Sequence, residues 1–142
     1  MKIFLTGATG FIGSHFLKHC LAAGHSATCS VRSAKQADAI RALGASAWEG
    51  DLQNHGKLSL ALAGMDVLIH AAGCRDLTAP ANLLLQSNVR LTQALVDAAA
   101  TAKVAQFIYI SAASVVMSKP VALLNVTESA PITSQAYLPY TR

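Results

Sequence analysis

The chain has 142 residues, of which 53% are hydrophobic and 13% are charged, so it can form one compact domain and does not have the composition of a disordered tail. Eleven lysines and arginines against seven acidic residues give a net charge of +4. Because no basic run of five or more residues occurs, this mild excess suits an anionic small ligand as well as a nucleic acid and does not decide between them.

Short apolar runs alternate along the chain with longer segments of helical periodicity. The apolar runs cover residues 2–6, 27–32, 46–50, 66–72 and 106–111. The helical segments cover residues 11–23, 34–43, 55–62 and 81–101. Several runs are apolar on both faces, which is typical of strands buried between helices. The alternation predicts an α/β fold over residues 1–142, a doubly wound parallel sheet with helices on both faces in three α/β/α layers.

The composition and periodicity of the sequence change after residue 111. Residues 112–142 contain Pro120, Pro131 and Pro139, many serines and threonines, and little periodicity. The sequence therefore predicts a long loop here, and a loop of this length in a compact domain is usually functional.

The first turn of the chain carries the strongest functional signal. The sequence TGATGFIG occupies residues 6–13, directly after the first strand and at the start of the first helix. Gly7 permits a tight turn, Gly10 lets the backbone approach a pyrophosphate, and Gly13 lets the helix pack closely on the strand. The helix N-terminus offers free N–H groups and a partial positive charge to phosphates, and we assign the neighbouring Thr9, Phe11 and Ile12 to the same site.

The glycine spacing resembles the cofactor fingerprint of the short-chain dehydrogenase/reductase family, extended branch, which has a Rossmann fold. Other short segments that resemble motifs of this family follow in the family's order along the whole chain. Together and in this order, these segments are a more specific signal than any one of them. These segments are GDL at residues 50–52, HAAG at 70–73, NV at 88–89 and ISAAS at 110–114, followed by Tyr140.

The end of the second strand bears on which nicotinamide cofactor binds. An NAD site usually has a carboxylate at this position to bind the ribose 2′-hydroxyl, whereas this strand ends at Arg32 and Ser33. A guanidinium can hold a 2′-phosphate through two hydrogen bonds, which favours NADP over NAD. The alternatives are that Arg32 stacks on adenine or faces solvent.

The resemblance implies further cofactor contacts. Asp51 and Leu52 would bind the adenine ring, although Asp51 is also suited to capping a helix. Ala71, Ala72 and Gly73 would line the cofactor ribose because small side chains allow close approach, or they only pack closely.

The resemblance also implies a catalytic centre. Tyr140 would be the proton donor of a hydride-transfer reaction, and Asn88 would stabilise the central helix and assist proton transfer, provided that it has a hydrogen-bond partner. Ala112 stands where the family has a catalytic hydroxyl. Ser111 and Ser114 flank it, with Ser114 favoured if the chain stays extended; otherwise the hydroxyl role is lost.

A family lysine four residues after Tyr140 would fall beyond residue 142. We therefore expect the chain to be the N-terminal part of a longer enzyme whose substrate lobe is absent. The expected function is an NAD(P)(H)-dependent reductase or dehydrogenase, similar to hydroxysteroid dehydrogenases or dihydroflavonol reductases. The alternatives are a sugar-nucleotide epimerase or dehydratase, and a non-catalytic protein that senses NADP.

Three cysteines without a C-x-x-C pair argue against a disulfide framework and a zinc site, so we expect no metal and a reducing, cytoplasmic compartment. No signal peptide or membrane span is expected. The expected partner is a small-molecule substrate, with no nucleic-acid or membrane partner, and a homodimer is left open.

Overall fold

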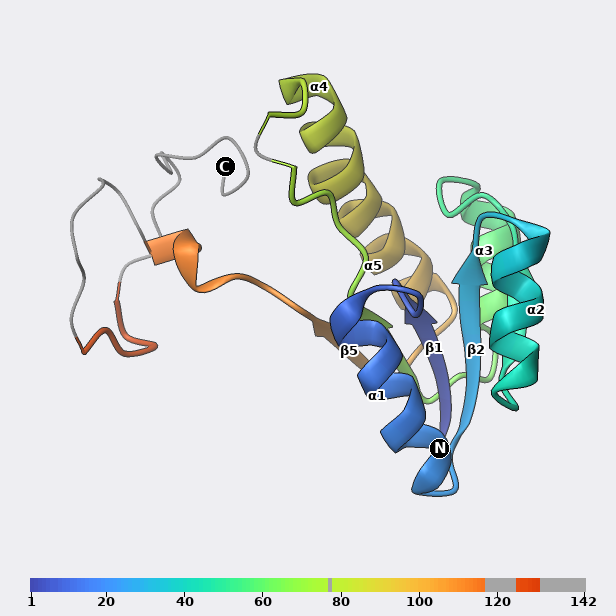
Figure 1. Ribbon diagram of the computed structural model, residues 1–142. Helices are drawn as coiled ribbons and strands as arrows, with labels where there is room; N and C mark the ends of the chain where they lie inside the picture. The colour runs from blue at the N-terminus through green and yellow to red at the C-terminus, as the bar shows by residue number, and fades with distance from the viewer. Residues whose placement is uncertain (77, 117–124, 131–142) are drawn as a thin grey trace.

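The computed structural model describes residues 1–76, 78–116 and 125–130 and has a single parallel sheet in this part of the chain (Figure 1). Its strand order is β3-β2-β1-β4-β5, so the predicted doubly wound α/β fold is confirmed. The strands are β1 (Lys2–Thr6), β2 (Ser26–Val31), β3 (Ser46–Glu49), β4 (Val67–His70) and β5 (Gln106–Tyr109).

Helices cover both faces of the sheet, as the two-sided apolar strands require. One core lies between the sheet and two helices, α1 (Phe11–Ala22) and α2 (Ala34–Ala42), and contains Leu5. The other core contains Phe4, which points to the opposite face and packs with α3 (His55–Leu62) and α5 (Leu91–Thr101). Successive residues of β1 therefore supply the two cores of a three-layer structure.

The predicted helix over residues 81–101 has the expected extent and an unexpected interior. It begins as α4 (Ala81–Leu84), continues as a π-helical segment, η1 (Leu85–Arg90), and ends as α5. The widened turn is visible where the Leu91 N–H donates to the carbonyl of Gln86, five residues earlier. At the junction with α5 the Thr92 hydroxyl donates to the carbonyl of Asn88, so a side chain competes for a backbone acceptor.

The sheet order places a ligand crevice at a defined edge. The chain runs outward from β1 to β2 and β3, then crosses to β4 on the other side of β1. The carboxyl ends of β1 and β4 therefore form a topological switch point, where open α/β sheets bind ligands. α1 begins at this edge, after the glycine turn (Figure 1).

The chain leaves the sheet earlier than expected at this edge. β4 ends at His70 and β5 at Tyr109, so residues 71–72 and 110–111 follow the strands rather than extend them. A 3-10 helix, η2 (Ala113–Val116), then begins inside the predicted loop. Residues 117–124 and 131–142, with Tyr140 among them, lie outside the described residues.

Candidate functional site

The glycine turn after β1 is packed so closely that side chains are excluded at two positions. Gly7 has φ +75°, and a Cβ there would lie 2.6 Å from the backbone nitrogen of Ala72. A Cβ on Gly13 would lie 2.1 Å from the Gly7 carbonyl oxygen. The turn therefore brings β1, the start of α1 and the segment after β4 together.

The first turn of α1 has no side-chain cap. Its N-cap residue is Gly10, and its first turn contains no acidic residue. In contrast, Ser33 caps α2 by accepting from the Gln36 N–H, and Asn54 caps α3 by accepting from the Lys57 N–H. Among the described residues, the free N–H groups at the start of α1 are thus left for an external acceptor, which is the arrangement that binds phosphate.

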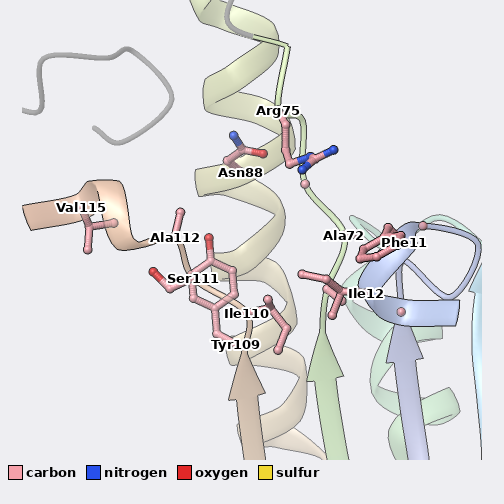
Figure 2. Close-up of a pocket in the computed structure, with 14 residues that line it drawn as sticks. Phe11, Ile12, Ala72, Arg75, Asn88, Tyr109, Ile110, Ser111, Ala112 and Val115 are labelled. Carbon is pink, nitrogen blue, oxygen red and sulfur yellow. The ribbon is translucent and has the colours of Figure 1, made fainter. Parts of the chain in front are cut away.

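Two cavities lie at the carboxyl edge of the sheet, one on each side of the glycine turn. The first, which we call the β5-side cavity, has a volume of about 440 Å³. Figure 2 shows Phe11 and Ile12 of α1 facing Tyr109, Ser111 and Ala112 across it. The rest of its lining is Gly10, Gly13, Ala71, Ala72, Gly73, Arg75, Asn88, Ile110 and Val115.

The second cavity, the β2-side cavity, has a volume of about 470 Å³ and is lined by Gly7, Thr9 and Arg32 among others. Ala72 and Gly73 line both cavities. The two cavities therefore border the same two residues beside the uncapped end of α1, which is the arrangement that an elongated ligand with a central anionic group requires.

The β2-side cavity contains part of the predicted adenine-binding set. Arg32 and Leu52 line it. Among the described residues no carboxylate forms a salt bridge with Arg32, whose backbone N–H donates to the Gln36 side chain over 2.9 Å. Ser33 is outside the lining and acts as the cap of α2.

Asp51 is likewise outside the lining of this cavity, while its neighbours Leu52 and Gln53 belong to it. The Asp51 carboxylate accepts from the Gln53 N–H over 2.9 Å in a local turn. The alternative that Asp51 caps a helix is wrong, because Asn54 caps α3.

The β5-side cavity contains three of the residues discussed for catalysis. Ser111 and Asn88 line it, and Ala112 lies beside them. Asn88 has the partner that burial in a helix requires: its side chain accepts from the Cys74 N–H over 2.7 Å and donates to the Cys74 carbonyl over 3.0 Å. The condition that favoured Ser114 does not hold, because the chain turns into η2 at residue 113 rather than staying extended.

Sequence reasoning missed the part played by His70, to which it gave no role beyond its place in the HAAG segment. His70 is fully buried, and its Nδ1 lies 2.7 Å from the Thr6 hydroxyl, which also accepts from the Ala72 N–H over 3.3 Å. The His70 Nε2 lies 3.0 Å from the Thr92 hydroxyl, which donates to the Asn88 carbonyl. We call His70, Thr6, Ala72, Thr92 and Asn88 the His70 network. The two side-chain contacts of His70 join residues that are 64 and 22 positions apart in the sequence, so a local sequence motif cannot reveal them.

Tyr109 and Arg75 were also missed. The Tyr109 ring stacks on His70 with centroids 5.3 Å apart and lines the β5-side cavity, as does the exposed Arg75. The only available signals were their positions near two strand ends, since Tyr109 is the last residue of β5 and Arg75 follows β4.

A family model described as NAD(P)H-binding matches residues 7–139. The chain belongs to this NAD(P)H-binding family. A ketoreductase of Stigmatella aurantiaca, named for a 4-hydroxy-2-methyl-3-oxo-4-farnesyl-3,4-dihydroquinoline-1-oxide substrate, is 33% identical over 141 residues, covering 99% of this chain and 42% of its own length. A 3-beta-hydroxysteroid dehydrogenase of Mycolicibacterium neoaurum is 29% identical over 141 residues, covering 94% of this chain and 38% of its own length.

A solved structure of a short-chain dehydrogenase/reductase superfamily protein from Agrobacterium tumefaciens, with bound NAD, superposes with a TM-score of 0.80. It is 25% identical and covers 99% of this chain and 41% of that chain. The resemblance to the short-chain dehydrogenase/reductase family is confirmed, and the NAD(P)H-binding chain spans about two fifths of its relatives' length.

The described part of this NAD(P)H-binding domain lacks two kinds of feature. None of its helices has the length and apolar character needed to cross a membrane. No group of three or more His, Cys, Asp and Glu side chains is placed to hold a metal ion in these residues.

Burial of His70 predicts an acid-labile domain. Desolvation lowers the pKa of the imidazole to about 4, against about 6.5 in an unfolded chain. Below pH 6.5 the unfolded state binds a proton that the folded state does not, so the unfolding free energy falls as the pH falls from about 6.5 to 4, by up to about 3 kcal/mol. Denaturant unfolding at a series of pH values measures this slope.

The matched comparison uses two histidine variants. His70→Asn should remove most of the slope over this pH range, whereas His19→Asn, on the exposed surface of α1, should retain it because His70 is still present. An equal slope in wild type and His70→Asn would contradict the prediction.

Proposed function

We propose that this chain is the cofactor-binding domain, residues 1–142, of a longer NADPH-dependent oxidoreductase that interconverts a carbonyl and an alcohol on a small molecule. One observation carries the proposal: Ala72 and Gly73, beside the uncapped N-terminus of α1, belong to the linings of both cavities. The membership of an NAD(P)H-binding family and the ketoreductase and dehydrogenase relatives support the reaction class.

The residues present fit a dinucleotide. The N–H groups beside Gly10 can bind the pyrophosphate, because no side chain of the described residues caps them. Arg32 and Leu52 would hold the adenosine half in the β2-side cavity, and the β5-side cavity would take the nicotinamide half and the substrate. When bound, the nicotinamide supplies or accepts a hydride.

The chain's own hydroxyl groups would handle the proton. Ser111 lines the β5-side cavity and can hydrogen-bond a substrate oxygen. We assign proton donation to Tyr140 on the family resemblance, since this residue lies outside the described part of the chain. The experiment that tests the function is titration of this chain with NADPH and NADH, followed by a turnover assay of the longer protein, in which NADPH absorbance at 340 nm is followed with a panel of ketones.

The preference for NADPH rests on Arg32. We expect Arg32→Ala to raise the Kd for NADPH by about tenfold or more, because a charge-assisted hydrogen bond contributes about 1.5–3 kcal/mol. The Kd for NADH should change by less than about twofold, since NADH has no 2′-phosphate. Fluorescence titration of both cofactors measures the two constants.

Arg41→Ala is the matched control, because it also removes one arginine charge. Arg41 lies in α2, outside the lining of the β2-side cavity, and pairs with Asp38 and Glu49. Equal weakening of both cofactors by Arg32→Ala would indicate stacking of Arg32 on adenine instead. A wild-type preference for NADH would contradict the NADPH assignment.

A second candidate, a protein that binds the dinucleotide without catalysis, is favoured by Ala112, which lines the β5-side cavity where the family has a hydroxyl. Tight NADPH binding by the longer protein, with no oxidation of NADPH by any ketone, would favour this sensor. Interconversion of sugar-nucleotide epimers without net cofactor oxidation would favour the epimerase alternative.

A further inference from the structure

The direction of every hydrogen bond in the His70 network follows from counting protons. The Asn88 carbonyl can only accept, so the Thr92 hydroxyl proton points to it. The Thr92 oxygen must then accept from His70, which places the imidazole proton on Nε2. At the other end the Ala72 N–H can only donate, so the Thr6 oxygen accepts it and the Thr6 hydroxyl proton points to the bare Nδ1 of His70.

The His70 tautomer with its proton on Nδ1 is incompatible with this set of hydrogen bonds. With its proton on Nδ1, His70 would donate to a Thr6 oxygen that already accepts from Ala72. The Thr6 hydroxyl proton would then have no acceptor among the described residues. Because Thr6 and His70 are both fully buried, water does not replace the lost partner, and an unsatisfied buried donor costs about 1–3 kcal/mol.

The two ends of the network hold one short piece of backbone. The first end binds the Ala72 N–H, and the second end is Asn88, whose side chain binds both backbone groups of Cys74. Between them lies Gly73, where a Cβ would meet the Asn88 Oδ1 at 3.4 Å. Residues 72–74 are thus held at both ends by hydrogen bonds, and the groups that form these bonds are connected to each other through the His70 imidazole.

We propose that His70 is a positioning residue for the dinucleotide. Its neutral Nε2–H form holds residues 72–74 in register with the glycine turn on one side and with η1 on the other, and two of these residues, Ala72 and Gly73, line both cavities. The network thereby sets dinucleotide affinity although neither His70 nor Thr92 lines a cavity. This proposal rests on the proposed function, and the experiment below separates the two.

The test removes one hydroxyl that lies outside both cavity linings. Thr92→Val keeps the shape of the side chain and deletes the group that accepts from His70. We expect the Kd for NADPH to rise about tenfold, and the ¹⁵N NMR shifts of the His70 ring to move toward the Nδ1–H form. Thr101→Val on the same helix, which deletes a hydroxyl that donates to the Asp97 carbonyl, should change neither measurement.

A conservative variant separates the hydroxyl from the methyl group. Thr92→Ser retains the hydroxyl, so it should keep the wild-type Kd and the wild-type tautomer. An equal loss of affinity in Thr92→Ser and Thr92→Val would overturn the proposal, because methyl packing would then be responsible. Should Thr92→Val fail to fold, the wild-type spectrum still decides: a dominant Nδ1–H form would overturn the proposal.

The failures of the two proposals differ. Wild-type protein that binds neither NADPH nor NADH would overturn both of them. Wild-type binding with an unchanged Kd in folded Thr92→Val would overturn the positioning role of His70 alone.

Discussion

Gly10→Leu is expected to abolish measurable NADPH binding while the domain stays folded. Gly10 lines the β5-side cavity at the start of α1, so a leucine would extend over the N–H groups that we assign to the pyrophosphate. We expect a loss of more than about 100-fold in affinity, equivalent to about 3 kcal/mol. Fluorescence titration, with circular dichroism to confirm folding, measures both parts of this prediction.

The backbone at Gly10 tolerates the change. Its φ of −81° and ψ of 173° are open to any residue. A Cβ there meets one atom closely, the Gly7 carbonyl oxygen at 3.2 Å, so the stability should fall by only about 1 kcal/mol. Gly56→Leu, at an exposed position of α3 outside both cavity linings, is the control and should bind NADPH normally. Undiminished binding in Gly10→Leu would contradict the assignment of the pyrophosphate site.

The fold could be predicted because its signals are local. Apolar runs such as residues 67–69 identify buried strands wherever they lie, and Gly24 and Gly44, with φ of +76° and +88°, follow the ends of α1 and α2. The limits of β4 and β5 were placed too far along the chain. Residues 71 and 110 still donate one backbone hydrogen bond each to a neighbouring strand, and residues 71–72 and 110–111 line a cavity, so their composition resembles that of the strands that they follow.

The site could be predicted only where its residues form a contiguous motif. The glycine turn was recognised because sequence spacing fixes its geometry. The partners of Asn88 and His70 could not be recognised in the same way. Asn88 contacts Cys74 and His70 contacts Thr92 because the chain crosses over from β4 to η1 and α5, and the composition of the sequence does not encode such contacts. A buried imidazole between two threonines also has no sequence signature, because Thr6 and Thr92 look like ordinary strand and helix residues.

Gly13→Ala should have the largest effect on stability. The added Cβ would lie 2.1 Å from the Gly7 carbonyl oxygen, 2.7 Å from the Gly7 carbonyl carbon and 3.1 Å from the Ala8 Cα. These are backbone atoms, so α1 must move away from the turn. We expect a loss of about 3 kcal/mol in the unfolding free energy, measured by denaturant titration. The better helix propensity of alanine acts in the opposite direction and contributes only about 1 kcal/mol.

Gly56→Ala isolates this propensity effect. Gly56 also lies in a helix, but a Cβ there would lie at an ordinary contact distance of 3.8 Å from the Asn54 Oδ1. The same substitution should therefore stabilise the domain by up to about 1 kcal/mol at Gly56 and destabilise it at Gly13. The opposite signs would arise from packing alone, because glycine and alanine differ by one methyl group at both sites. Stabilisation by Gly13→Ala would mean that the glycine turn and α1 are not in close contact, and it would contradict the packing that brings the start of α1 next to Gly7.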